Sequence, residues 1–150
     1  MPQSLAKIML HVVFGTKHRE PMISPEMRDD LASYIAGILR ELDSPPIIVR
    51  RVADHVHILC CLSRTRSISS ILKELKQFSS AWVKEKWPGK QDFYWQSGYA
   101  VSSVSQSNVD VVRKYIDGQE EHHRTRTFQE EFISFLRKHK IPYDERYVWD

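Results

Sequence analysis

Two histidines one residue apart are the first side chains in this sequence that could do chemistry. His55 and His57 stand in the apolar run "RVADHVHILCC", residues 51–61. In an extended chain alternate side chains share a face, so both imidazoles point the same way, with Cα atoms roughly 6 to 7 Å apart. That spacing favours two nitrogen ligands for one ion. The alternation sends Val56 and Ile58 to the core face, and we expect the histidine face to be partly open.

A tyrosine and a glutamine further along the chain could complete such a site. Tyr115 and Gln119 stand four residues apart in "NVDVVRKYIDGQEEHHR", so on a helix they lie on the same face. If this helix docks over the histidine face, it brings a phenol and an amide oxygen to the two imidazoles. The group would hold a metal through two nitrogen ligands and one oxygen ligand, with positions free for water or a phosphate oxygen.

The elements that must position these residues follow from hydrophobic periodicity and turn signals. We expect strands at residues 5–14, 47–53, 55–62 and within 93–105, and helices at 25–42, 67–87, 109–122 and 127–140. The order is β-α-β-β-α-β with additional C-terminal helices. This predicts an α+β, ferredoxin-like (RRM-like) fold with a four-stranded antiparallel sheet. Such folds commonly receive nucleic acid on the open face of the sheet.

Length, charge and cysteine content limit the class of protein. With 150 residues, 41% of them hydrophobic, we expect one domain over residues 1–150. A formal charge of +3 is compatible with a polyanionic partner but does not demonstrate one. The only cysteines, Cys60 and Cys61, point to opposite faces of a strand and cannot easily bridge. Without a signal peptide or an apolar run of ~18 to 20 residues, we expect a cytoplasmic protein with no membrane partner.

The combination of motifs resembles a known family. A His-hydrophobe-His strand followed by a helix with Tyr-x-x-x-Gln is similar to the single-tyrosine HUH transposases of the insertion-sequence 200/605 type. The similarity runs through nearly the whole chain, from "HVVFGTKHR" to "YDERYVWD". The resemblance implies that His55, His57 and Gln119 bind a divalent ion, Mg²⁺ or Mn²⁺, and that Tyr115 is the nucleophile.

The resemblance also implies an activity and partners. The protein would be a DNA transposase that cleaves and rejoins single-stranded DNA at hairpin-forming ends of a mobile element, through a 5′-phosphotyrosine intermediate and a free 3′-hydroxyl. It would need no nucleotide cofactor. It would act as a homodimer with composite active sites, in which one chain supplies His55 and His57 and the other supplies Tyr115 and Gln119.

Other interpretations stay open at this point. One is a domesticated relative that processes chromosomal repeat hairpins, and another is a non-catalytic module that binds single-stranded nucleic acid. A histidine-based ribonuclease would leave Tyr115 and Gln119 without a role. His11 could point at the open face of the sheet, although a structural role is favoured. The candidates for contact with DNA phosphates are Lys17, His18, Arg19, Arg64 and Arg66.

Overall fold

The four predicted strands form one antiparallel sheet. The computed structural model describes residues 2–118 and 126–150. The strands are β1 (Met9–Gly15), β2 (Pro46–Arg51), β3 (His55–Cys61) and β4 (Ala100–Val104). They lie in the order β2-β3-β1-β4, and each neighbouring pair is antiparallel. This is the strand order of the predicted ferredoxin-like fold, which the structure confirms.

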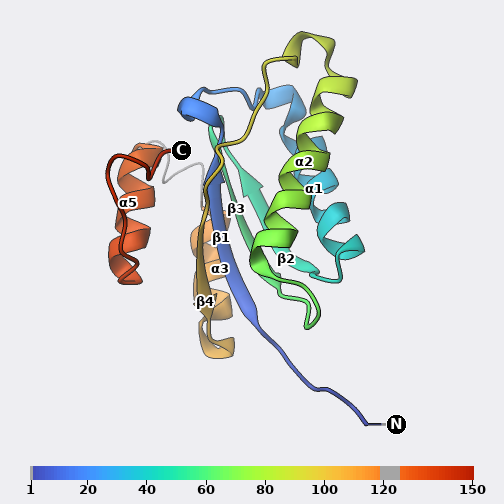
Figure 1. Cartoon of the computed structure of the whole chain (residues 1–150), viewed down its shortest axis with the longest axis vertical. Coiled ribbons are helices and arrows are strands. Elements are labelled where there is room, and N and C mark those ends of the chain that lie inside the picture. The colour runs from blue at the N-terminus through green and yellow to red at the C-terminus, as the bar shows by residue number, and fades with distance from the viewer. Residues whose placement is uncertain (1, 119–125) are drawn as a thin grey trace.

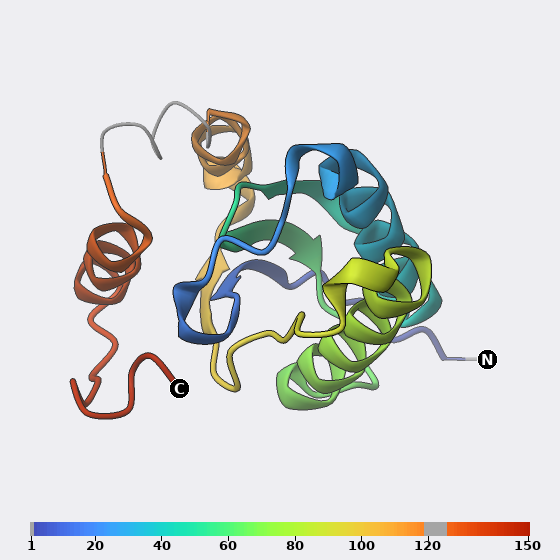
Figure 2. The same cartoon turned by 90° about the horizontal axis from the view of Figure 1, so that it is seen from above.

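Helices cover both faces of this sheet. They are α1 (Arg28–Glu41), α2 (Ile68–Lys86), α3 (Val109–Asp117) and α5 (Phe128–Lys138). Short 3₁₀ turns stand at Lys17–Arg19, Pro25–Met27, Pro88–Lys90 and Gln106–Asn108. In Figures 1 and 2, α1 and α2 lie on one side of the sheet and α3 and α5 lie on the other. The third helix was predicted for residues 109–122, of which 119–122 fall outside the described part of the chain.

The main core lies between the sheet and the pair α1 and α2. Alternate residues of β3, namely Val56, Ile58 and Cys60, are buried in it, as the strand alternation predicts. The helices close this core with apolar side chains that recur at helical spacing. Those that are almost completely buried are Leu31, Ile35, Leu39, Ile71, Leu72, Leu75 and Val83. This layer fixes β3 and so determines that the other residues of β3 face away from it.

The opposite face of the sheet is covered, which corrects the expectation that the histidines would be exposed. Phe128 and Phe132 of α5 pack against Val13 and Ala100, at the β1–β4 side of the sheet. A third cluster joins α3 to the other side, and its buried members are Met9, Ile48, Leu59, Val109 and Ile116. The side chains of His55 and His57 are therefore 0% and 1% exposed. The histidine face is an interior between a sheet and two helices.

Two expectations about the chemical environment can be compared with the structure. Cys60 is buried, Cys61 is partly buried, and both are free thiols, as their opposite orientations in β3 predict. Within residues 2–118 and 126–150, no helix combines the length and the apolar character needed to cross a bilayer.

Candidate metal centre and nucleophile

The two imidazoles are held in place through their Nδ1 atoms. His55 Nδ1 lies 2.7 Å from Oδ1 of Asp54, and His57 Nδ1 lies 2.9 Å from Nε2 of His11 on β1. Such hydrogen bonds fix the orientation of a histidine ring and leave its other nitrogen available. His11, which could have served only packing, thus lies on the histidine face and positions His57.

The Nε2 atoms of both imidazoles converge on a buried carboxylate. Glu131 of α5 is 3% exposed, and its Oε2 lies 3.4 Å from Nε2 of His55. Its Oε1 lies 3.2 Å from Nε2 of His57. One ligand atom from each of these three residues lies within 4.8 Å of the other two. Two imidazole nitrogens and one carboxylate oxygen are a donor set that suits divalent metal ions.

Tyr115 reaches the same carboxylate from α3. Its hydroxyl donates a hydrogen bond of 2.5 Å to Oε1 of Glu131. The centroid of its ring lies 6.0 Å from that of His57, with the two planes at 75°. The structure therefore brings the predicted tyrosine to the predicted histidines within one chain. Gln119, the predicted third ligand, lies outside the described residues.

The charges of this cluster are strongly coupled. Burial works to lower the pKa of His55, but its bonds to Asp54 and Glu131 outweigh burial and raise that pKa. Burial works to raise the pKa of Glu131, but its contacts with His55, His57 and the phenol hold that pKa far below the usual range. Glu131 is therefore ionised. Burial, the hydrogen bond to Glu131 and the charge of Glu131 together raise the pKa of Tyr115 well above its ordinary value.

These protonation states fit a site that exchanges protons for a metal ion. The carboxylate of Glu131 favours the protonated form of His55, whose pKa is raised by its bonds to Asp54 and Glu131. A divalent ion requires neutral imidazoles and an ionised carboxylate, so its binding would compete with protons for His55. The three side chains can hold such an ion through their existing donor atoms.

The helix α5 delivers Glu131 because its apolar face packs on the sheet. The side chain of Thr127 caps α5 by accepting a hydrogen bond from the backbone N–H of Glu130. The ring of Phe128 stacks on the ring of His55, with centroids 4.4 Å apart. Phe135 meets the ring of His11 edge-on at 5.0 Å. Contacts at both ends of the helix thus hold Glu131 over the imidazoles.

Sequence reasoning missed Glu131, although a signal was present. Glu131 follows Phe128 by three residues and precedes Phe135 by four, so it lies on the apolar face of this helix. A carboxylate on an apolar stripe needs a partner in the interior. The neighbouring Glu130 is on the exposed face. In the sequence the two residues appear as an ordinary acidic pair, "EE", which does not indicate that only Glu131 is buried.

The predicted DNA contacts fall into two separate groups. Lys17, His18 and Arg19 follow the end of β1 at which Gly15 pairs with His55. Within this group Lys17 lies 5.6 Å from the centre of the Tyr94 ring. Arg64 and Arg66 follow the other end of β3, far along the strand from His55. There Arg66 pairs with Glu74 at 3.0 Å, and Arg64 donates to the carbonyl oxygen of Ser4. Only the first group lies at the His55 end of the sheet.

Comparisons with known proteins identify the family of the chain. The sequence model of the family described as "Transposase IS200 like" matches residues 4–119. The ISDra2 transposase TnpA of Deinococcus radiodurans is 26% identical over 117 residues, which cover 73% of this chain and 81% of that protein. The transposase for insertion sequence element IS200 of Salmonella typhimurium is 27% identical over 114 residues, covering 73% and 74%.

Solved structures show the same fold. A candidate transposase from Deinococcus radiodurans R1 superposes with a TM-score of 0.65 at 22% identity, covering 79% of this chain and 98% of that one. A "REP associates tyrosine transposase bound to a REP hairpin" superposes with a TM-score of 0.53 at 15% identity, covering 78% and 67%. The matched sequences define a DNA-processing enzyme. The chain belongs to the IS200-like transposase family and is a DNA transposase.

Proposed function

We propose that this transposase cleaves and rejoins single-stranded DNA in a metal-dependent reaction in which Tyr115 forms a 5′-phosphotyrosine intermediate. One observation carries the proposal. The carboxylate of Glu131 accepts a hydrogen bond from the phenol of Tyr115 and also contacts the imidazoles of His55 and His57. The phenol oxygen thus contacts one candidate ligand, Glu131, directly and reaches the other two, His55 and His57, through it.

His55, His57 and Glu131 would hold the ion. Their mixed nitrogen and oxygen donors fit Mn²⁺ and, with water completing the shell, Mg²⁺. When bound, the ion supplies positive charge to the scissile phosphate and to the departing oxygen. Gln119 remains a proposed further ligand, since the resemblance implies it.

The side chains of the chain itself account for the transfer step. Glu131 orients the phenol of Tyr115 by accepting its hydrogen bond. The phenol oxygen forms a bond to phosphorus, and the bond from phosphorus to the 3′ oxygen breaks. The proton from the phenol ends on that 3′ oxygen. His11 and Asp54 keep the two imidazoles oriented throughout.

The reverse step rejoins DNA without an added energy source. A phosphotyrosine ester replaces a phosphodiester of similar energy, so a second 3′-hydroxyl can attack it and release Tyr115. Both steps use the same side chains. No nucleotide cofactor is needed, as the resemblance implied.

Hairpin-forming single strands are the proposed substrate. The REP-associated tyrosine transposase with the same fold is described as bound to a REP hairpin, which favours a hairpin partner here. The same comparison is compatible with the alternative that this chain is a domesticated relative acting on chromosomal repeat hairpins. The single domain over residues 1–150 and the cytoplasmic location stay predictions.

A symmetric dimer with composite sites also stays a proposal. In the structure α3 places Tyr115 on the histidines of its own chain. Because the second chain of a homodimer is identical, an exchanged α3 could make the same contacts in the partner. Residues 105–108, between β4 and α3, would then connect the two halves.

A denaturing gel tests the proposed reaction. The protein is incubated with single-stranded oligonucleotides taken from the flanks of its own gene, with Mg²⁺ or Mn²⁺ or with a chelator. We expect a protein–DNA adduct that survives denaturation, requires the ion, and is absent in the variant His55→Ala/His57→Ala. DNA binding without an adduct under every condition would instead identify a non-catalytic binding module.

A further inference from the structure

A cavity of about 340 Å³ adjoins the candidate nucleophile. It lies between β1 and β4 of the sheet and the helices α3 and α5. Tyr115 and Glu131 line it, whereas His55 and His57 do not. The residues of its wall that matter here are His11, Ser102, Val111, Tyr115, Phe135 and Lys138. Its volume falls within the range of about 300 to 1,000 Å³ that is typical of small-molecule sites.

Ser102 gives the floor of this cavity an unused polar group. Ser102 is 8% exposed, and its hydroxyl oxygen has no hydrogen-bond partner among residues 2–118 and 126–150. It is paired in register with His11, so the two side chains lie next to each other on the same face of the sheet. A buried polar group without a partner is unfavourable, and a ligand in the cavity could supply that partner.

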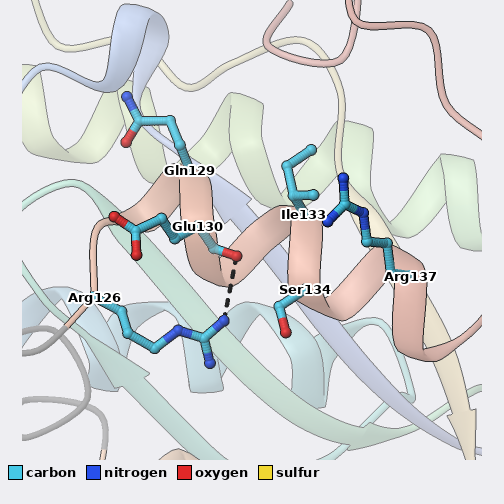
Figure 3. Close-up of a pocket in the computed structure, with 6 residues that line it drawn as sticks. All are labelled: Arg126, Gln129, Glu130, Ile133, Ser134 and Arg137. Carbon is cyan, nitrogen blue, oxygen red and sulfur yellow. Dashed lines mark hydrogen bonds between the residues drawn. The ribbon is translucent and has the colours of Figure 1, made fainter.

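The cavity continues into an open hollow along the outer side of α5. This hollow, shown in Figure 3, has a volume of about 540 Å³. Arg126 and Ser134 line both the hollow and the cavity, and Arg137 stands at the far end of the hollow. Two guanidinium groups and the carboxylate of Glu130 leave it with net positive charge. Its wall therefore suits the phosphates of a nucleic-acid strand.

We propose that the cavity binds one base of the substrate strand, the base of the nucleotide whose 5′-phosphate becomes attached to Tyr115. The inference rests on the proposed function, because the covalent intermediate fixes that nucleotide beside the phenol. The hydroxyl of Ser102 contacts the edge of this base, and the ring of Phe135 and the side chain of Val111 border it. The phosphates that follow run along the hollow past Arg126 and Arg137. The site is a specificity pocket that reads the first nucleotide of the transferred strand.

The chemistry of the wall selects this occupant. A base has polar edges and flat apolar faces, and the cavity combines serine hydroxyls with Phe135 and three valines. Lys138 lies at the wall and can balance a nearby phosphate. The nucleotide on the other side of the break is not tethered, because it leaves with its 3′-hydroxyl. Only the 3′-side nucleotide stays next to the cavity in the intermediate.

Fluorescence of the covalent adduct tests the assignment. The break is first mapped in an oligonucleotide from the flank of the gene, and 2-aminopurine is then placed immediately 3′ or immediately 5′ of it. We expect the 3′ probe in the adduct to be severalfold less accessible to a soluble quencher than in free DNA. The 5′ probe, which is released, should regain the accessibility of free DNA.

Two variants determine whether the cavity causes this protection. Ser102→Leu fills the floor, and Val111→Trp blocks the mouth from a residue that is 64% exposed and can change without unfolding the core. Both variants should still form the adduct, but its 3′ probe should be as accessible to the quencher as in free DNA. The matched controls are Ser69→Leu on α2 and Asp110→Trp on α3, which replace exposed residues outside the cavity. Both should retain full protection.

The outcomes separate this inference from the proposed function. No adduct in the wild type would refute the proposed reaction and this assignment with it. An adduct whose 3′ base is fully accessible would overturn only the base pocket. If the base stays protected from the quencher in Val111→Trp, the base pocket is also overturned, because another surface must then protect the base.

Discussion

Glu131 connects the two functional parts of the site, because its carboxylate touches both imidazoles and the phenol. Without an ion, this contact works against catalysis, since burial and the charge of Glu131 raise the pKa of Tyr115. A cation bound to the carboxylate would offset that charge. The residues therefore explain why cleavage should depend on the ion. The carboxylate that would hold the ion otherwise suppresses ionisation of the proposed nucleophile.

The variant Glu131→Gln tests this dual role. It keeps the size of the side chain and removes its charge, so the pKa of Tyr115 should fall, while burial still keeps it above the ordinary value of about 10. Ultraviolet difference titration against Tyr115→Phe measures this pKa. Affinity for Mn²⁺ should fall by at least roughly tenfold in calorimetry.

The matched control is Glu130→Gln, on the exposed face of the same helix. It should leave both the pKa of Tyr115 and the affinity for Mn²⁺ unchanged. Equal behaviour of the two variants would show that Glu131 is not a ligand.

The buried ring of His11 predicts a dependence of stability on pH. Burial, followed by the nearby His57, lowers the pKa of His11 to about 2 from an ordinary value of 6.5. Below pH 6.5 the unfolded chain takes up a proton on His11 that the folded chain does not. The contribution of neutral His11 to the free energy of unfolding is therefore fully present above that pH and is lost on acidification. The slope is at most about 1.4 kcal/mol per pH unit.

The change His11→Gln removes this titration. Urea unfolding with a chelator present should show that the wild type loses its stability advantage over the variant as the pH falls from about 7 to about 5. Subtracting the variant removes the opposite contribution of His55, whose pKa is raised. A difference that does not change with pH would mean that His11 titrates normally in the folded protein.

At the level of elements, the strands could be predicted from the sequence and the docking of α5 could not. Period-two alternation identifies the face of β3 that carries His55 and His57, since their neighbours Val56 and Ile58 need a core. The periodicity of the last helix indicates an apolar face. It does not indicate that this face packs on the histidines, because Phe128 and Glu131 meet them only through the tertiary fold.

Gly15 is the position at which the sheet admits α5. A Cβ atom built on Gly15 would lie 2.5 Å from Cε2 of Phe128 and 3.1 Å from the carbonyl oxygen of Asp54. The ring of Phe128 cannot retreat easily, because it is stacked against His55. The absence of a side chain in β1 thus lets α5 approach closely enough for Glu131 to reach the site.

The variant Gly15→Ala should therefore destabilise the protein by about 1 to 3 kcal/mol and weaken binding of Mn²⁺, because α5 is displaced. The control Gly37→Ala adds the same methyl group in α1, where nothing lies within 4 Å. It should stabilise the protein by about 0.5 to 1 kcal/mol. Urea unfolding and calorimetry measure both effects, and an equal gain in stability for the two variants would refute the close approach.

At the level of the whole molecule, one part of the site lies inside the family match and the other part lies beyond it. The family match ends at residue 119 and includes the histidines and Tyr115, whereas Glu131 lies beyond it. The sheet and α3 thus carry what the family shares, and α5 closes the site from outside the matched region. Sequence reasoning found the first part through its motifs and missed the second, which has no motif of its own.

A mixing experiment tests whether two chains share their sites. The variants His55→Ala/His57→Ala and Tyr115→Phe should each be inactive alone, and they are combined under conditions of subunit exchange. With random pairing, about half of the dimers are mixed and each contains one intact composite site, so cleavage should recover to about a quarter of the wild-type level. No recovery, with mixed dimers confirmed by mass spectrometry, would show that each chain uses its own tyrosine.

The central claim is that Tyr115 attacks the DNA backbone, and mapping the covalent bond tests it most directly. The adduct formed with single-stranded DNA and Mn²⁺ is digested with protease and nuclease and analysed by tandem mass spectrometry. The account predicts a nucleotide joined through its 5′-phosphate to the oxygen of Tyr115, and no adduct in Tyr115→Phe. A nucleotide joined to another residue, or an adduct of normal yield in Tyr115→Phe, would contradict it.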